Sequence, residues 1–76
     1  MKLRVATSQF PVTPDVATNA RSIHRQMRIA RKKGAAVIHF CEGALSGYAG
    51  QDFKSFRSFD WRALREHSES VAQLAD

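Results

Sequence analysis

The sequence has one cysteine, no long apolar run and few acidic residues, and each shortage excludes a class of protein. The single Cys41 permits no intrachain disulfide, which is typical of a reducing compartment. No run approaches the roughly 18 apolar residues that a membrane-spanning helix needs, and the polar residues of 1–10 leave no apolar core for a signal peptide. We therefore expect a soluble, cytoplasmic protein without a membrane partner.

Acidic residues are outnumbered by basic ones, 7 Asp and Glu against 12 Lys and Arg, and the net charge is +5. A basic balance can indicate nucleic-acid binding. Four of the cations share one face of an expected helix: Arg21, Arg25, Arg28 and Lys32. No aromatic side chain lies between Asn19 and Gly34 to stack on bases. We therefore interpret this face as solvated, and a nucleic-acid partner is the less favoured alternative.

Residues that hold metals or phosphates are sparse and unsuitably spaced. The three histidines, His24, His39 and His67, have no metal-ligand spacing. The chain also has no glycine-rich phosphate loop of the P-loop type. We expect no metal and no cofactor.

The 76 residues that are present predict one small α/β domain. Residues 2–10 have the alternation of a strand, and the prolines at 11 and 14 bracket a turn. A helix is expected over 15–33, capped by Asp15 or Thr18 and ended by Gly34. Its apolar stripe falls at steps of three and four residues: Val16, Ala20, Ile23, Met27 and Ala30. On this interpretation His24 lies at the solvated surface.

A second strand is expected over 35–41, where the apolar run shows no alternation and therefore indicates burial on both faces. The strand–helix–strand order predicts a right-handed crossover between parallel strands. Phe10 and Glu42 then emerge at the same edge of the sheet, where open α/β sheets bind ligands. Glu42 is a candidate acid or base at that edge, and a solvated loop carboxylate is the alternative.

A glycine-rich loop over 42–52 and a final helix over 60–75, capped by Asp60, complete the pattern. Tyr48, within the loop, either lines a pocket or covers the edge of the sheet. Two strands and two helices leave strand edges unpaired and apolar stripes uncovered. We therefore expect the front part of a larger domain, which self-associates or is only partly ordered when isolated.

The stretch Phe40-Cys41-Glu42-Gly43-Ala44-Leu45-Ser46-Gly47-Tyr48 resembles the first catalytic motif of the nitrilase superfamily, the carbon–nitrogen hydrolases. Phe40, Glu42, Gly47 and Tyr48 match the family pattern, while Cys41 replaces its usual proline. Upstream features are similar as well: a strand ending in Gln9, a proline-containing turn and Asn19 early in a helix. The resemblance implies a βαβ-plus-helix fragment of an α-β-β-α sandwich, spanning 1–76 as the amino-terminal part of one domain.

The same resemblance implies Glu–Lys–Cys chemistry, in which Glu42 is the general base and the substrate is a non-peptide amide, nitrile or carbamoyl group. The family's Lys and nucleophilic Cys have no counterpart within these 76 residues, so we expect the isolated chain to be inactive. Adjacent strand residues face opposite sides, so we expect Cys41 to be a buried, inert thiol facing away from Glu42. The family also implies a homodimer. The alternative function is a small basic α/β module that binds RNA or a protein.

Overall fold

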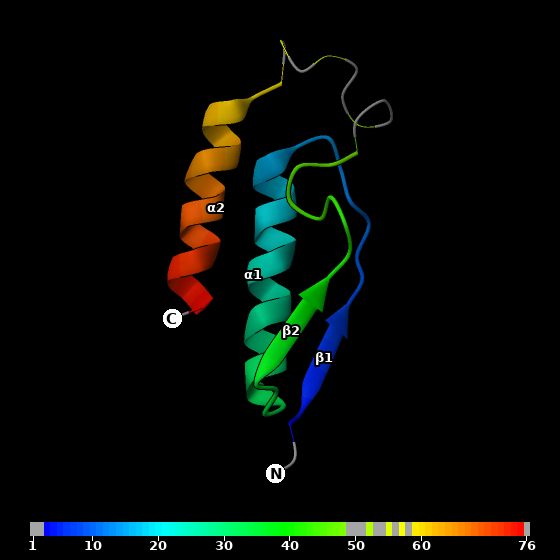
Figure 1. Cartoon of the computed structure of the whole chain (residues 1–76), viewed down its shortest axis with the longest axis vertical. Coiled ribbons are helices and arrows are strands. Elements are labelled where there is room, and N and C mark those ends of the chain that lie inside the picture. The colour runs from blue at the N-terminus through cyan, green and yellow to red at the C-terminus, as the bar shows by residue number, and fades with distance from the viewer. Residues whose placement is uncertain (1–2, 49–51, 53–54, 56, 58, 76) are drawn as a thin grey trace.

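Two parallel strands and two helices make up the part of the chain that the structure describes. The computed structural model describes residues 3–48, 52, 55, 57 and 59–75. The elements follow the order β1 (Val5–Ser8), α1 (Val16–Lys32), β2 (Val37–Phe40) and α2 (Trp61–Ala75), as Figure 1 shows. The chain is thus a small mixed α/β fold.

The two strands pair over four residues each, from Val5 opposite Val37 to Ser8 opposite Phe40. Both strands are shorter than the expected 2–10 and 35–41. The backbone ladder between them covers only these four pairs of residues. It stops at Phe40, where the chain enters a turn over residues 42–46. Residue 2 lies outside the described residues.

Local signals fix both ends of α1. The Asp15 carboxylate accepts a hydrogen bond from the Thr18 backbone N–H at 3.2 Å, so Asp15 caps the helix as expected. At the other end Gly34 has φ +79°, and the Ala35 N–H donates to the Ala30 carbonyl at 3.0 Å. Together with the bond from the Gly34 N–H to the Arg31 carbonyl, this is a Schellman motif, which a left-handed glycine permits.

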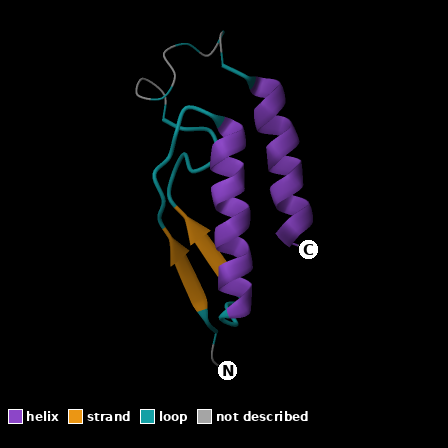
Figure 2. Cartoon of the chain, turned by 180° about the vertical axis from the view of Figure 1, so that it is seen from behind, coloured by secondary structure: helices purple, strands orange, loops and turns teal. Residues whose placement is uncertain are grey.

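The core lies between α1 and one face of the sheet. The expected stripe is buried at Val16, Ala20, Ile23 and Ala30, each 7% exposed or less, while Met27 is half-buried. The prediction that the second strand is buried on both faces is wrong. Val37 is 47% exposed and its ladder partner Val5 is 55% exposed. Figures 1 and 2 give the reason: α1 covers one face, and α2 lies beside α1 rather than on the opposite face.

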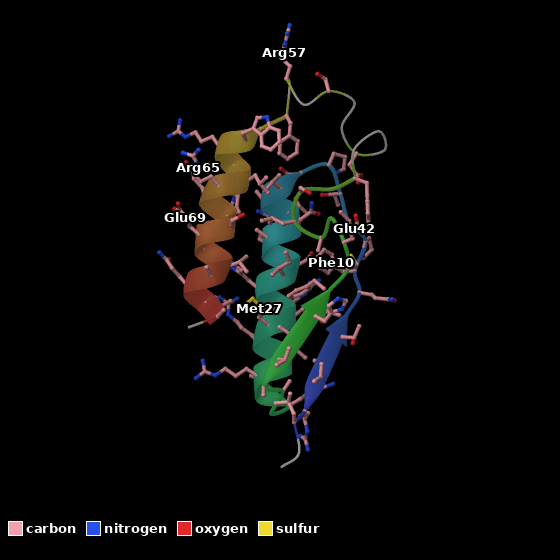
Figure 3. The ribbon with its side chains drawn as sticks, in the orientation of Figure 1. Phe10, Met27, Glu42, Arg57, Arg65 and Glu69 are labelled. Carbon is pink, nitrogen blue, oxygen red and sulfur yellow. The ribbon has the colours of Figure 1, made fainter. Side chains whose placement is uncertain are left out.

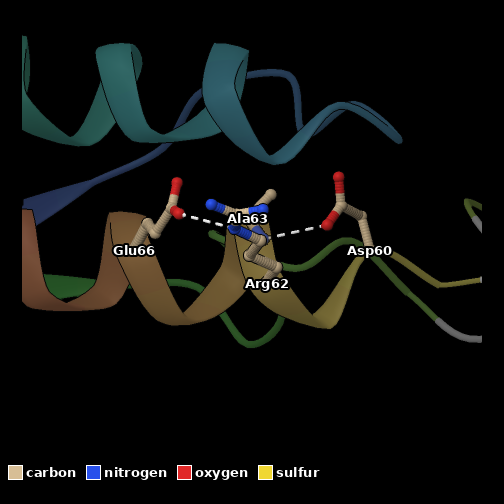
Figure 4. Close-up of polar contacts among 4 residues, drawn as sticks. All are labelled: Asp60, Arg62, Ala63 and Glu66. Carbon is tan, nitrogen blue, oxygen red and sulfur yellow. Dashed lines mark hydrogen bonds and ion pairs between the residues drawn. The ribbon is translucent and has the colours of Figure 1, made fainter.

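Helix α2 runs in the same direction as α1 and packs along it (Figure 1). The Asp60 carboxylate accepts the Ala63 N–H at 2.9 Å, which caps this helix as expected, and an exposed Arg62–Glu66 ion pair spans 3.1 Å (Figure 4). Within Trp61–Ala75 no residue is fully buried. The apolar stripe of α2 is therefore only partly covered.

Histidine 24 differs from its expected solvated position. Its Nε2 atom lies 3.2 Å from the Ser70 hydroxyl of α2, and the side chain is half-buried. The two residues are 46 positions apart in the chain, so the contact depends on the packing of α2 against α1.

Candidate functional site

The structure places the ends of both strands at one edge of the sheet. Ser8 pairs with Phe40, so the chain leaves β1 and β2 at the same level. The ring of Phe40 packs edge to face with the ring of Phe10, which follows β1, and the ring centroids are 6.3 Å apart. Figure 3 labels Phe10 and Glu42 at this end of the sheet. Phe10 belongs to the segment that leaves β1, and Glu42 belongs to the turn that follows β2.

Two glycines let this turn fold tightly. Gly43 has φ +70°, and a Cβ atom there would lie 3.2 Å from Cε1 of Tyr48. Gly47 has φ +82°, and a Cβ atom there would lie only 2.8 Å from Cβ of Asp52. Any other residue would therefore strain the backbone and displace a neighbour. Glycine at these positions keeps Tyr48 and Asp52 close to the turn.

Asn19 fastens the turn to α1. Its side chain is 0% exposed, and its Nδ2 donates to the carbonyls of Thr13 at 2.8 Å and Leu45 at 2.9 Å. Its Oδ1 accepts the Thr13 backbone N–H at 2.8 Å and the Thr13 hydroxyl at 3.0 Å. One amide therefore holds the loop before α1 and the turn after β2 in fixed positions.

Sequence reasoning assigned no role to Asn19 beyond the family resemblance. The sequence does indicate a structural role for Asn19, because this residue lies within the apolar stripe of the helix, next to Val16, Ala20 and Ile23. A buried amide at this position needs hydrogen-bond partners. The backbone groups of the neighbouring loops are the nearest groups that can serve as partners.

Tyr48 and Asp52 close the far side of the turn. The Tyr48 N–H donates to Oδ2 of Asp52 at 2.7 Å, and the Asp52 N–H donates to the Tyr48 carbonyl at 2.7 Å. Partial desolvation raises the pKa of Tyr48 above its usual 10.0, helped by the adjacent Cys41 thiol and by the charges of Glu42 and Asp52. The phenol thus lies among groups that carry or acquire negative charge.

A shallow cleft of about 330 Å³ lies at this edge. It is lined by Gln9, Phe10, Val12, Cys41, Tyr48 and Asp52. Tyr48 is thus part of the lining of this cleft, and its role as a substrate-pocket residue stays a prediction. Glu42 is exposed and is not part of the lining, although it lies near the phenol.

The expected burial of Cys41 is wrong. The thiol is half-buried rather than buried, and it lines the cleft beside Tyr48. The expectation assumed a buried strand through residue 41, whereas β2 ends at Phe40 and the chain then turns.

No protein-family model, curated protein or solved structure matches the chain. A functional assignment therefore depends on the residues and their local geometry.

Three further observations concern the described residues. Ser8 is 5% exposed, and its hydroxyl has no hydrogen-bond partner among the described residues. Among those same residues, no three His, Cys, Asp or Glu side chains are arranged to hold a metal ion. The described helices include none that is long and apolar enough to cross a membrane.

Proposed function

We propose that residues 1–76 are the amino-terminal part of a carbon–nitrogen hydrolase of the nitrilase superfamily, in an α-β-β-α sandwich, and that Glu42 is its general base. The observation that carries the proposal is the position of Glu42, two residues after the end of a parallel strand and at the edge where both strands end. Ligands of open α/β sheets bind outside the carboxyl ends of the strands. The motif from Phe40 to Tyr48 supports the proposed family. The position of Glu42 supports its proposed role as the general base.

The proposed reaction divides the work among three groups. A cysteine attacks the carbon of an amide, nitrile or carbamoyl group, and its thiolate form is the nucleophile. A carboxylate within hydrogen-bond reach removes the thiol proton, and a lysine stabilises the negative charge that develops on the substrate. Glu42 is the residue of this chain that fits the carboxylate role. The other two groups come from outside residues 1–76.

Cys41 is a poor substitute for that nucleophile. It is the immediate neighbour of Glu42, and its thiol contacts the phenol of Tyr48 in the cleft. Glu42, by contrast, is exposed outside the cleft lining. We expect Cys41 to form part of the wall of the site, and the isolated chain to turn over no amide or nitrile.

The test begins with the residues encoded after Asp76 in the native gene, where the proposal requires a strand ending in lysine and, later, a cysteine after an apolar strand. In that longer protein, Glu42→Gln keeps the shape of the side chain and removes the base. Loss of a positioned base costs about a hundredfold to ten-thousandfold in kcat. Glu69→Gln is the matched control, because Glu69 is exposed on α2, away from the edge (Figure 3). Near-wild-type turnover by folded Glu42→Gln protein would refute the assignment.

A second candidate function is a basic binding module. The observation in its favour is that Arg21, Arg25, Arg28 and Lys32 are all exposed, and α1 contains no acidic residue. Such a module would bind an RNA duplex through phosphate contacts, with an affinity that falls steeply as salt increases. Titration of a labelled duplex at two salt concentrations separates the candidates, since the hydrolase proposal predicts no salt-dependent binding.

A further inference from the structure

The position of Glu42 depends on the backbone of the turn that carries it. The side chain of Glu42 is exposed, and among the described residues its carboxylate has no hydrogen-bond partner. A general base must lie within hydrogen-bond reach of the proton that it removes, at about 2.6–3.2 Å. Since hydrogen bonds of the described side chains do not fix the carboxylate, its position is set by whatever holds the turn.

Two backbone hydrogen bonds make this turn a compact unit. The Ala44 N–H donates to the Cys41 carbonyl at 3.2 Å. The Gly47 N–H donates to the Gly43 carbonyl at 2.8 Å. The two bonded segments share Gly43 and Ala44, and Glu42 lies within the first. A contact that fixes one residue of the turn therefore also limits the movement of Glu42.

The tie between the turn and α1 is the side chain of Asn19. Its Nδ2 donates to the Leu45 carbonyl at 2.9 Å, and in the part of the chain that the structure describes this is the hydrogen bond that joins the turn to the helix. The Asn19 side chain is 0% exposed, so water does not compete for this bond. The place of the turn relative to α1 is thus fixed by one buried amide.

Asn19 also fixes the turn relative to the opposite wall of the carboxyl-edge cleft. One wall belongs to the segment between β1 and α1, and its lining residues are Gln9, Phe10 and Val12. The other wall belongs to the segment after β2, and its lining residues are Cys41, Tyr48 and Asp52. Thr13 directly follows the first wall, and Asn19 binds both Thr13 and Leu45. The position of Glu42 relative to a ligand in the cleft therefore depends on Asn19.

The alternative is that Asn19 only stabilises the fold. Its bonds to Thr13 are local, since six positions separate the two residues, and they order the start of α1. Its bond to Leu45 spans 26 positions and reaches the turn three residues after Glu42. Ordering the start of α1 does not require this second bond, whereas fixing the place of Glu42 does.

We propose that Asn19 is a positioning residue of the proposed hydrolase. Its bond to Leu45 holds the turn where the Glu42 carboxylate removes the proton of the nucleophilic thiol. The inference rests on the proposed function, because Asn19 acts through Glu42. Displacing a catalytic geometry by about 1 Å costs about a hundredfold in rate, so loss of this tie lowers kcat while the base itself is retained.

The test uses the longer protein that contains the lysine and the nucleophilic cysteine, with kcat referred to the folded fraction measured by circular dichroism. Asn19→Ala should lower kcat about tenfold to a hundredfold. Asn19→Asp is the second variant, because it keeps the acceptor for the Thr13 N–H and lacks the donor for the Leu45 carbonyl. It should lower kcat by a similar factor.

Ile23→Val is the matched control for stability. Ile23 is 4% exposed on the same helix, so the variant loses a buried methyl group and is destabilised. It leaves the bond between Asn19 and Leu45 in place, so kcat of the folded protein should be unchanged.

A double-mutant cycle separates positioning from a general effect on the site. On the Glu42→Gln background, Asn19→Ala should lower kcat less than about twofold, because the base that it positions is already absent. An effect that does not pass through Glu42 predicts the same fold loss on both backgrounds.

The outcomes distinguish this inference from the proposed function. Unchanged kcat in a folded Asn19 variant, an equal loss on both backgrounds, or an equal loss in Ile23→Val would overturn the inference and leave the proposed function standing. Near-wild-type turnover by folded Glu42→Gln protein would instead refute the proposed function, and this inference with it.

Discussion

Replacing Asn19 by alanine should be the most damaging single change to the carboxyl edge. The Asn19 amide is 0% exposed and exchanges hydrogen bonds with three backbone groups, the N–H and C=O of Thr13 and the C=O of Leu45. Each such bond contributes about 1 kcal/mol, so their loss costs about 3 kcal/mol before any cavity term. A chain of 76 residues has a total stability of about 4–11 kcal/mol, so this is a large fraction.

Urea unfolding followed through Trp61, the chain's one tryptophan, measures this loss. Gln26→Ala is the control, because Gln26 is half-buried on the same helix. A second measurement reports on the turn itself. Tyr48 is the chain's one tyrosine, so its absorbance titrates a single phenol. We expect the pKa of Tyr48 to return toward 10.0 in Asn19→Ala, because the turn after β2 is no longer tied to α1.

Two outcomes would refute this reasoning. A free energy of unfolding within about 0.5 kcal/mol of wild type would show that these three bonds contribute little. An unchanged Tyr48 titration in a destabilised but folded variant would show that Asn19 stabilises α1 without positioning the turn. Asn19→Asp separates the two kinds of hydrogen bond. It retains the acceptor for the Thr13 N–H, but it places a carboxylate, which has no donor, against the Leu45 carbonyl.

Four further perturbations have clear expected outcomes. Gly47→Ala should cost about 2 kcal/mol or more in urea unfolding, because it adds left-handed strain to a 2.8 Å approach to Asp52, and a wild-type midpoint would contradict this. Ser8→Ala removes a buried hydroxyl without a described partner and should be neutral or stabilise by about 1 kcal/mol, so a clear loss of stability would reveal a missing partner. The pKa of Tyr48 is raised on folding, so its contribution to stability is complete below pH 10 and declines as pH rises through the folded pKa. The pKa of Asp15 is lowered, chiefly by the hydrogen bond from the Thr18 side chain. Its contribution to stability is therefore complete above pH 3.8 and declines as pH falls through the folded pKa. Asp15→Asn should make the stability less dependent on pH in this acidic range.

The sequence by itself determined the elements whose causes are local. The cap at Asp15, the stripe from Val16 to Ala30 and the left-handed Gly34 predict α1 to within one residue at each end. These signals operate within a few residues of one another, so periodicity and capping rules detect them. The common edge of Phe10 and Glu42 also followed from sequence order, because a helical crossover between two paired strands makes them parallel, so their carboxyl ends share an edge.

The tertiary structure decided everything that depends on contacts between distant segments. The apolar composition of β2 indicated burial, but burial requires a second layer, and α2 packs beside α1 instead. The exposure of Cys41 depended on where the ladder with β1 ends, which the pattern of β2 alone does not contain. The contacts of Asn19 with Leu45 and of His24 with Ser70 join residues 26 and 46 positions apart. Side-chain periodicity shows which face of an element is apolar; which neighbour covers that face is set by the packing of the whole chain.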